Sequence, residues 1–138
     1  MREILFRAKR EATNEWVYGY FVKEYDDFQI YVNSKIITKS GHEYVREDTL
    51  GQFTGLTDKN GTKIFEGDVV RISEDYYDGL HYSGNEVYYS DGAFCVEYET
   101  PKYDVTSIGF LVREGVEVEI IGNIYDNPEL IGGAENDN

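Results

Sequence analysis

The run from Gly51 to Val70, GQFTGLTDKNGTKIFEGDVV, constrains the fold of this chain more than any other segment. It reads as a strand, a tight turn at Asn60-Gly61 and a second strand, and Glu66-Gly67-Asp68 then leads into a third strand. An Asn-Gly pair between apolar runs predicts a type I′ turn, in which both residues take positive φ. A chain with this segment is expected to be built from short antiparallel strands.

The rest of the sequence repeats this pattern of short apolar runs and turn residues. The 13 Tyr, seven Phe and one Trp also favour strands over helices. Strands are predicted in pairs around turns, at residues 3–9 and 15–22, 29–32 and 36–38, 86–90 and 93–99, and 109–113 and 116–122. Gly19 marks a bulge or a close backbone approach. One helical turn is expected at Asn127–Leu130, with Asn127 as N-cap and Pro128 at the first helical position.

Short strands with tight turns predict a mainly β fold, a small SH3-like β-barrel with an N-terminal β-hairpin region and at most short helical turns. The strand at residues 66–72, followed by a long loop and two hairpins, resembles the opening of such a barrel. Residues 1–50 are expected to form the hairpin region and to pack on the barrel. Residues 51–131 are expected to form the barrel with a long acidic loop at 73–85, and residues 132–138 a frayed tail.

The net charge of −14 is concentrated in the second half of the chain. Residues 1–73 hold 12 acidic and 11 basic side chains, whereas residues 74–138 hold 15 acidic side chains against Lys102 and Arg113. Such a field repels nucleic acid and attracts a basic partner. The alternative explanation is that the charge only keeps a small acidic protein soluble.

An acidic, tyrosine-rich surface is the strongest candidate for a binding site. Tyrosine combines a large rigid contact area with a polar tip and is enriched at protein interfaces, and neighbouring carboxylates steer basic partners. The alternative is that these tyrosines only pack against or cover the barrel. The predicted partner-binding residues are Asp75, Tyr76, Tyr77, Asp78, Tyr82, Tyr88 and Tyr89.

Nothing in the sequence predicts an enzyme, a cofactor or a metal site. Asp58-Lys59-Asn60-Gly61 matches part of a calcium loop, but the first and last acidic ligands are missing. Glu66 and Asp68 have no third ligand beside them. A nucleophilic pair of Cys95 and His81 is possible in principle, but a small half-buried thiol is the commoner case.

The single cysteine excludes a disulfide within the chain and favours a reducing compartment. The opening residues MREILFRAKREA lack the apolar stretch of a signal peptide, and no apolar run is long enough to span a bilayer. The protein is therefore expected in the cytoplasm of a bacterial host, without a membrane partner.

Three blocks of the chain, residues 1–22, 51–70 and 120–131, resemble the YopX-like family of phage and prophage proteins. The resemblance implies a mostly β protein with an SH3-like barrel and an N-terminal hairpin region, encoded by a phage or prophage. It implies no established enzyme activity, no assigned ligand and no catalytic residues.

The sequence therefore predicts a non-enzymatic accessory protein that presents its acidic, tyrosine-rich face to a basic host or phage protein. A nucleic-acid-binding barrel is the alternative, although the charge makes nucleic acid an unfavourable partner, and a metal-dependent hydrolase ranks last. Nucleic-acid binding requires the basic residues of the N-terminal half to line one groove: Arg2, Arg7, Lys9, Arg10, Lys23, Lys35 and Lys39. Self-association through strand edges or exchange of the N-terminal hairpin is a further possibility.

Overall fold

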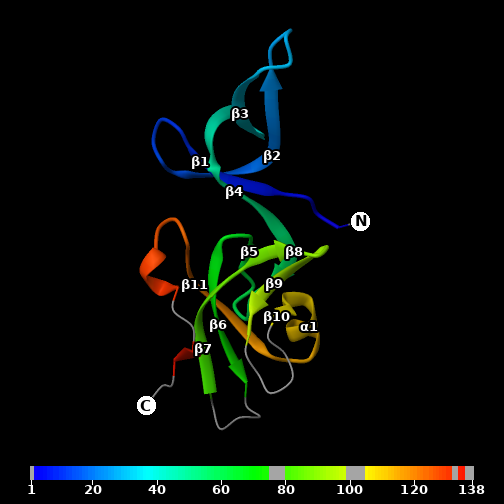
Figure 1. Ribbon diagram of the computed structural model, residues 1–138, viewed down its shortest axis with the longest axis vertical. Helices are drawn as coiled ribbons and strands as arrows, with labels where there is room; N and C mark the ends of the chain where they lie inside the picture. Colours follow the sequence, from blue (N-terminus) through cyan, green and yellow to red (C-terminus); the bar gives the residue numbers. More distant parts are fainter. Residues whose placement is uncertain (1, 75–79, 99–104, 132–133, 136–138) are drawn as a thin grey trace. The chain divides into compact units, whose positions relative to one another are not determined.

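The computed structural model describes residues 2–74, 80–98, 105–131 and 134–135, with the backbone alone at 74, 80–83 and 134–135. The chain is mainly β, as the sequence predicts, and its described residues include one α-helix and one 3-10 turn. It divides into two compact units, unit 1 (Met1–Gly55) and unit 2 (Leu56–Asn138) (Figure 1).

Unit 1 is built from four antiparallel strands: β1 (Phe6–Arg10), β2 (Trp16–Tyr25), β3 (Tyr31–Thr38) and β4 (Gly41–Thr57). The predicted N-terminal hairpin is confirmed, because Phe6 pairs with Gly19 and Lys9 with Trp16. β4 also pairs with β1, placing Gln52 opposite Phe6. The ladder therefore runs from β1 through β2, β3 and β4 and returns to β1.

The core of unit 1 is small and aliphatic. Each strand contributes one buried apolar residue to this cluster, namely Ala8, Val17, Ile36 and Val45, and Phe6, Phe21 and Leu50 pack around them. Gly19 lies at a close approach of β2 and β3. A Cβ built there would overlap the carbonyl oxygen of Ile37, which confirms the close backbone approach predicted for this glycine.

The prediction of two short strands around a turn at residues 33–35 is wrong. β3 runs without a break from Tyr31 to Thr38, and the chain turns earlier, at Asp26–Ile30. The Asp26 carboxylate accepts hydrogen bonds from the backbone N–H groups of Phe28 and Ile30, both at 2.9 Å. An aspartate that holds the loop backbone in this way fixes the turn more strongly than the Asn-Ser pair that follows.

The same loop recurs in unit 2 at Asp58–Thr62. The Asp58 N–H donates to the carbonyl of Thr62, and the Asp58 carboxylate accepts from the N–H groups of Asn60 and Thr62. Gly61 has φ +82°, but Asn60 is not in the left-handed region, so the predicted type I′ turn is wrong at this place. The hydrogen bonds to the Asp58 carboxylate favour a longer loop in which one residue is left-handed. This residue is Gly61 here and Gln29 (φ +64°) in the matching loop of unit 1.

Unit 2 contains a four-stranded sheet in the order β11-β6-β7-β12, a three-stranded sheet in the order β10-β9-β8, and β5 (Lys63–Phe65), which pairs with β4. Their bounds are β6 Asp68–Glu74, β7 Leu80–Glu86, β8 Tyr88–Ser90, β9 Ala93–Glu97, β10 Val105–Ser107, β11 Glu117–Asn123 and β12 Ala134–Glu135. Val87 alone separates β7 from β8, so one stretch of chain passes from the first sheet into the second. The core consists of Ile64, Val70, Ile72, Val87, Val96, Tyr98, Ile108, Leu111 and Val118.

The predicted loop at 73–85 is wrong in its extent. Residues 80–86 form β7, which pairs with β6 so that His81 lies opposite Ser73 and Tyr82 opposite Ile72. The segment LHYSGNE has little strand preference of its own, so pairing with the apolar strand β6 decides its conformation. Most of the predicted tail at 132–138 lies outside the described residues, but Ala134–Glu135 pair with β7.

The predicted hairpin of residues 109–113 and 116–122 is wrong in its first arm. Residues Ile108–Arg113 form helix α1, and Ser107 caps it by accepting the Phe110 N–H at 3.2 Å. Ile108 and Leu111, three residues apart, are the buried positions, which is a helical spacing. The second arm is confirmed as β11. No helix in the described ranges is long and apolar enough to cross a bilayer.

The short helical turn predicted near the C-terminus is confirmed as the 3-10 turn Pro128–Leu130. Asn127 precedes it, but its side chain makes no cap and instead accepts the N–H of Asn123 at 3.3 Å. Gly122 leaves room for this contact, since a Cβ there would lie 2.6 Å from the Asn127 side-chain oxygen.

Candidate functional site

Most of the predicted acidic, tyrosine-rich loop is not covered by the structure. Tyr82 lies on β7, where its backbone pairs with Ile72 on one side and Ala134 on the other. Four of the seven predicted partner-binding residues lie outside the described residues: Asp75, Tyr76, Tyr77 and Asp78. Their role therefore stays a prediction, and the described part of the candidate surface is the β8–β9 hairpin.

The β8–β9 hairpin is confirmed around the turn at Asp91-Gly92. Both residues have positive φ, +50° and +81°, so the turn geometry predicted for Asn60-Gly61 occurs here instead. Tyr89 pairs with Phe94, and the two rings meet edge to face with centroids 5.4 Å apart. Tyr89 nevertheless remains 58% exposed and available to a partner.

Tyr88 points to the opposite side of the hairpin from Tyr89, because successive residues of a strand alternate between its two sides. It pairs with Cys95, and Glu86 and Glu97 lie two residues along on the same side of their strands. We call Glu86, Tyr88, Cys95 and Glu97 the acidic face. Burial, followed by the charge of Glu97, raises the pKa of Glu86 above its usual value. Burial and then Glu97 also raise the pKa of Tyr88.

Burial and the neighbouring charge of Glu97 both oppose the ionisation of Glu86. Within the described part of the chain, no Lys or Arg lies within ion-pair distance of Glu86 or Glu97. A cationic side chain brought between the two carboxylates would remove this repulsion. The acidic face is therefore suited to receive a lysine or arginine from another molecule.

Cys95 is not suited to act as a nucleophile. Its thiol is buried, and burial, with a further contribution from Asp91, raises its pKa. Its sulfur lies 3.6 Å from the carbonyl oxygen of Ala93. A thiol that stays protonated is a poor nucleophile. The His81 side chain lies outside the described residues, so the Cys95–His81 pair is not tested.

Asp58 and Asp68, the two aspartates of the segment 51–70, accept hydrogen bonds from backbone N–H groups. The Asp58 carboxylate also accepts the Ile120 N–H at 3.0 Å. Burial opposes its ionisation, but the three backbone donors outweigh burial and lower the pKa of Asp58. Asp68 is buried and accepts the Phe65 N–H at 2.7 Å. Among the described residues, no three His, Cys, Asp or Glu side chains are grouped to hold a metal ion.

Five of the seven basic residues that would have to line a nucleic-acid groove are paired with carboxylates or buried. Several pair with carboxylates: Arg10 with Glu43 (3.5 Å), Lys23 with Glu47 (2.7 Å) and Lys35 with Glu24 (2.8 Å). Arg7 and Lys9 are buried and lie over the ring of Trp16, at 4.6 and 5.4 Å from its centroid. This arrangement offers little free positive charge to a phosphate backbone.

Comparison with known families decides where this fold belongs. The model of the YopX protein family matches residues 5–132, nearly the whole chain. The chain belongs to the YopX family. The resemblance seen in the three sequence blocks is thereby confirmed.

One curated protein and two solved structures are also similar to this chain. The SPbeta prophage-derived uncharacterized protein YopX of Bacillus subtilis (strain 168) is 35% identical over 77 residues, which cover 54% of each chain, so the match spans about half of that relative. The crystal structure of B. subtilis YopX has a TM-score of 0.61 at 23% identity and covers 96% of this chain and 100% of that one. Protein EF1440 from Enterococcus faecalis has a TM-score of 0.55 at 24% identity, with the same coverage. These two likenesses establish a shared fold.

This YopX-family chain also exposes aromatic side chains in unit 1, which the sequence analysis did not predict. Phe28 falls in the polar segment KEYDDF and is 83% exposed. An aromatic residue next to a turn-forming Asp-Asp pair was the available signal. The other strongly exposed aromatic residues of unit 1 are Tyr18, Tyr20, Tyr25, Tyr31 and Tyr44.

Proposed function

We propose that this YopX-family protein is a non-enzymatic interaction protein that binds a basic host or phage protein through unit 2. The observation that carries the proposal is the pair of neighbouring carboxylates, Glu86 and Glu97, beside Tyr88, with no Lys or Arg at ion-pair distance among the described residues. A lysine or arginine of the partner would neutralise both, and Tyr88, on the same side of the hairpin, would supply contact area. The prophage origin of the B. subtilis relative supports a role in the phage or its host.

The charge distribution supports the same partner chemistry. Residues 56–138 hold 18 acidic and five basic side chains, whereas residues 1–55 hold nine and eight. An SH3-like arrangement of unit 2 is part of the proposal, supported by the continuous passage from β7 into β8 at Val87. Small barrels of this kind serve as rigid scaffolds for binding surfaces. The loop residues Asp75 and Asp78 would extend the acidic surface.

The test is affinity capture of partners from a host lysate at low and at physiological salt. The site variant is Glu86→Lys with Glu97→Lys. The matched control is Glu114→Lys with Glu129→Lys, which makes the same change in net charge at two exposed positions elsewhere in unit 2. We expect the wild-type chain and the control to retain a basic partner and the site variant to lose it.

Two outcomes would contradict the proposal. Equal losses from both charge-reversed variants would mean that net charge alone attracts the partner. Retention of every partner by the site variant would mean that the acidic face is not the binding surface. Circular dichroism of each variant checks that the strands remain folded.

A further inference from the structure

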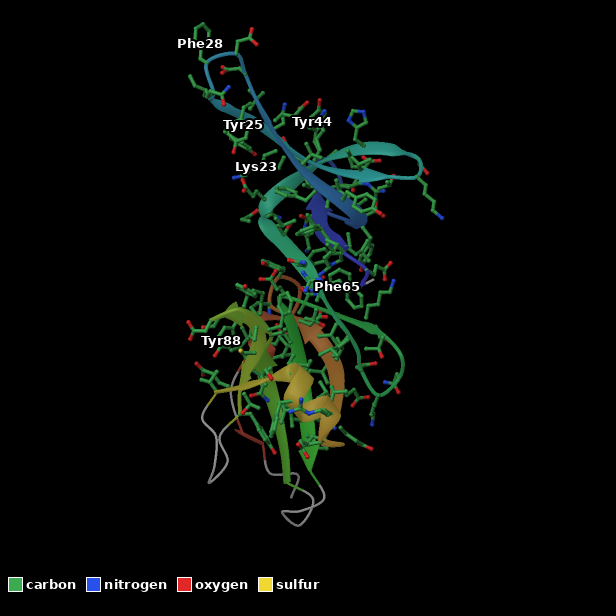
Figure 2. The ribbon with its side chains drawn as sticks, turned by 90° about the vertical axis from the view of Figure 1, so that its right-hand side faces the viewer. Lys23, Tyr25, Phe28, Tyr44, Phe65 and Tyr88 are labelled. Carbon is green, nitrogen blue, oxygen red and sulfur yellow. The ribbon has the colours of Figure 1, made fainter. Side chains whose placement is uncertain are left out.

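The outer end of the β2–β3 hairpin extends past the core of unit 1 and exposes apolar side chains. The last core contacts of the two strands are made by Phe21 and Ile36. Beyond them, residues 23–33 form a projection that we call the finger, with Phe28 at its tip (Figure 2). The exposed apolar residues of the finger are Tyr25, Phe28, Ile30, Tyr31 and Val32. A cluster of this kind on a small protein marks an interaction surface.

The tip of the finger differs from an equivalent loop in the same chain. Asp26–Ile30 and Asp58–Thr62 have the same hydrogen bonds, so their residues correspond one to one. Where unit 2 has Asn60 and Thr62, the finger has Phe28 and Ile30. Where unit 2 has Gly61, the finger has Gln29, which is strained at φ +64°. The loop itself needs neither the exposed apolar residues nor the strain, which points to selection for binding.

The tip also carries negative charge without a local counter-charge. In the described parts of the chain, neither Asp26 nor Asp27 has an ion-pair partner. The two lysines of this hairpin are already engaged, Lys23 by Glu47 at 2.7 Å and Lys35 by Glu24 at 2.8 Å. The tip therefore presents an aromatic anchor directly after two carboxylates in the sequence.

We propose that the finger docks into an apolar pocket with a basic rim on a partner protein, with Phe28 inserted as the anchor. Aromatic anchors in desolvated pockets dominate the affinity of protein interfaces, and charges at the rim add orientation and speed. Asp26 and Asp27 disfavour an anionic membrane or a nucleic acid as the occupant. A second copy of the chain, at a net charge of −14, is a poor source of a basic rim. The finger lies in unit 1 and shares no residue with the acidic face, which lies in unit 2.

Site-specific cross-linking in the full chain tests the proposal. The photoreactive residue benzoylphenylalanine replaces Phe28 in one sample and Tyr44 in a control, since Tyr44 is also exposed but lies outside the finger. We expect the Phe28 position to cross-link one protein in host lysate at a peptide that contains Lys or Arg beside apolar residues. Titration of that purified protein then measures affinity for the unmodified chain and its variants.

With the identified protein, Phe28→Ala is expected to weaken binding at least about 30-fold, a loss in the range of interface hot spots. Asp27→Lys is expected to slow association and to reduce its salt dependence. Tyr44→Ala and the double variant Glu86→Lys with Glu97→Lys should leave this affinity unchanged. The last result separates the finger from the acidic face, so that either proposal can fail alone.

Several results would overturn the proposal. The first is a cross-link from the Phe28 position to a second copy of the chain, and the second is cross-linking no stronger than that from the Tyr44 position. The third is a Phe28→Ala variant that binds the identified protein with wild-type affinity. Phe28-dependent binding to phosphatidylcholine vesicles, with or without phosphatidylserine, or to single-stranded oligothymidylate would assign a different occupant. Phe28 is 83% exposed, so an unchanged melting temperature of Phe28→Ala is expected and serves as the folding control.

Discussion

Asp58 and Asp26 occupy the same position in two matching loops, and their replacement by alanine should have unequal effects. Asp58→Ala removes the acceptor of three backbone N–H groups, those of Asn60, Thr62 and Ile120. Asp26→Ala removes the acceptor of two, both in an exposed loop. The third donor of Asp58 belongs to β11, 62 residues along the chain, so this aspartate also attaches the loop to the sheet.

The magnitude follows from the exposure of the donors. Asn60 and Thr62 are exposed residues, so water can replace the carboxylate at their N–H groups at a cost of about 0.5 kcal/mol each. Ile120 is half-buried, and its N–H loses a charged acceptor at about 2 kcal/mol. The free energy of unfolding of unit 2 should therefore fall by about 3 kcal/mol in Asp58→Ala. In Asp26→Ala, that of unit 1 should fall by only about 1 kcal/mol, the typical cost of losing a capping side chain.

The pH dependence gives a second signature of the same carboxylate. The pKa of Asp58 is lowered from its usual value of 3.8, so its stabilising effect is present above that pH. The effect is lost as the pH falls through the lower pKa of the folded state. The stability difference between the wild-type chain and Asp58→Ala should therefore be constant near neutral pH and shrink in strong acid.

Urea denaturation with two probes measures these differences. Trp16 is the single tryptophan, so its fluorescence reports unit 1, and hydrogen exchange of the β6 and β11 amides reports unit 2. Equal losses from the two alanine variants would refute the reasoning, since the contact to Ile120 would then contribute nothing. A stability difference that does not change in strong acid would refute the assigned charge.

Three further predictions test the fold and the acidic face. Gly19→Ala should destabilise unit 1 by about 3 kcal/mol, at the upper end for overpacking, because the added Cβ meets backbone rather than a movable side chain. Trp16 fluorescence in urea measures this loss, and wild-type stability of the variant would contradict the close approach. Gln29→Gly should stabilise unit 1 by about 0.5–1 kcal/mol, and Gly61→Gln should destabilise unit 2 by a similar amount. Glycine relieves the strain of positive φ, although it also raises the entropy of the unfolded chain. Changes of the same sign in the two variants would be inconsistent with matching loops. Glu86 has a raised pKa, so its charged form destabilises the folded state, and Glu86→Gln should raise stability at neutral pH but not below pH 4.5. Thermal melts at both pH values check this, and a stability gain in acid would disprove that burial and Glu97 destabilise the charged form of Glu86.

The parts of the fold that the sequence predicts correctly are those specified by local pattern. Alternation placed β1, β2, β9 and β11, and the turn residues Asp91-Gly92 placed the β8–β9 hairpin. The errors occur where distant contacts decide. β7 has little strand preference and forms by pairing with β6, while Ile108 and Leu111 turn a short apolar run into a helix because both reach the core.

The acidic face could have been predicted from the sequence, whereas the finger could not. A two-residue turn at Asp91-Gly92 places Tyr88 opposite Cys95, and the same register carried outward brings Glu86 towards Glu97. The finger depends on where the chain turns between β2 and β3. That position is set by the Asp26 carboxylate, and a polar segment gives no periodicity from which to locate it.

The position of β1 between β2 and β4 has a consequence for the order in which the chain acquires its structure during synthesis. The β2–β3 hairpin is local and can form as soon as its residues leave the ribosome. β1 gains its second neighbour only when Gln52 emerges and pairs with Phe6, 46 residues after Phe6 was made. Until then, one edge of the first strand is open to other nascent chains, so the speed of translation through residues 11–52 governs the risk of misassembly.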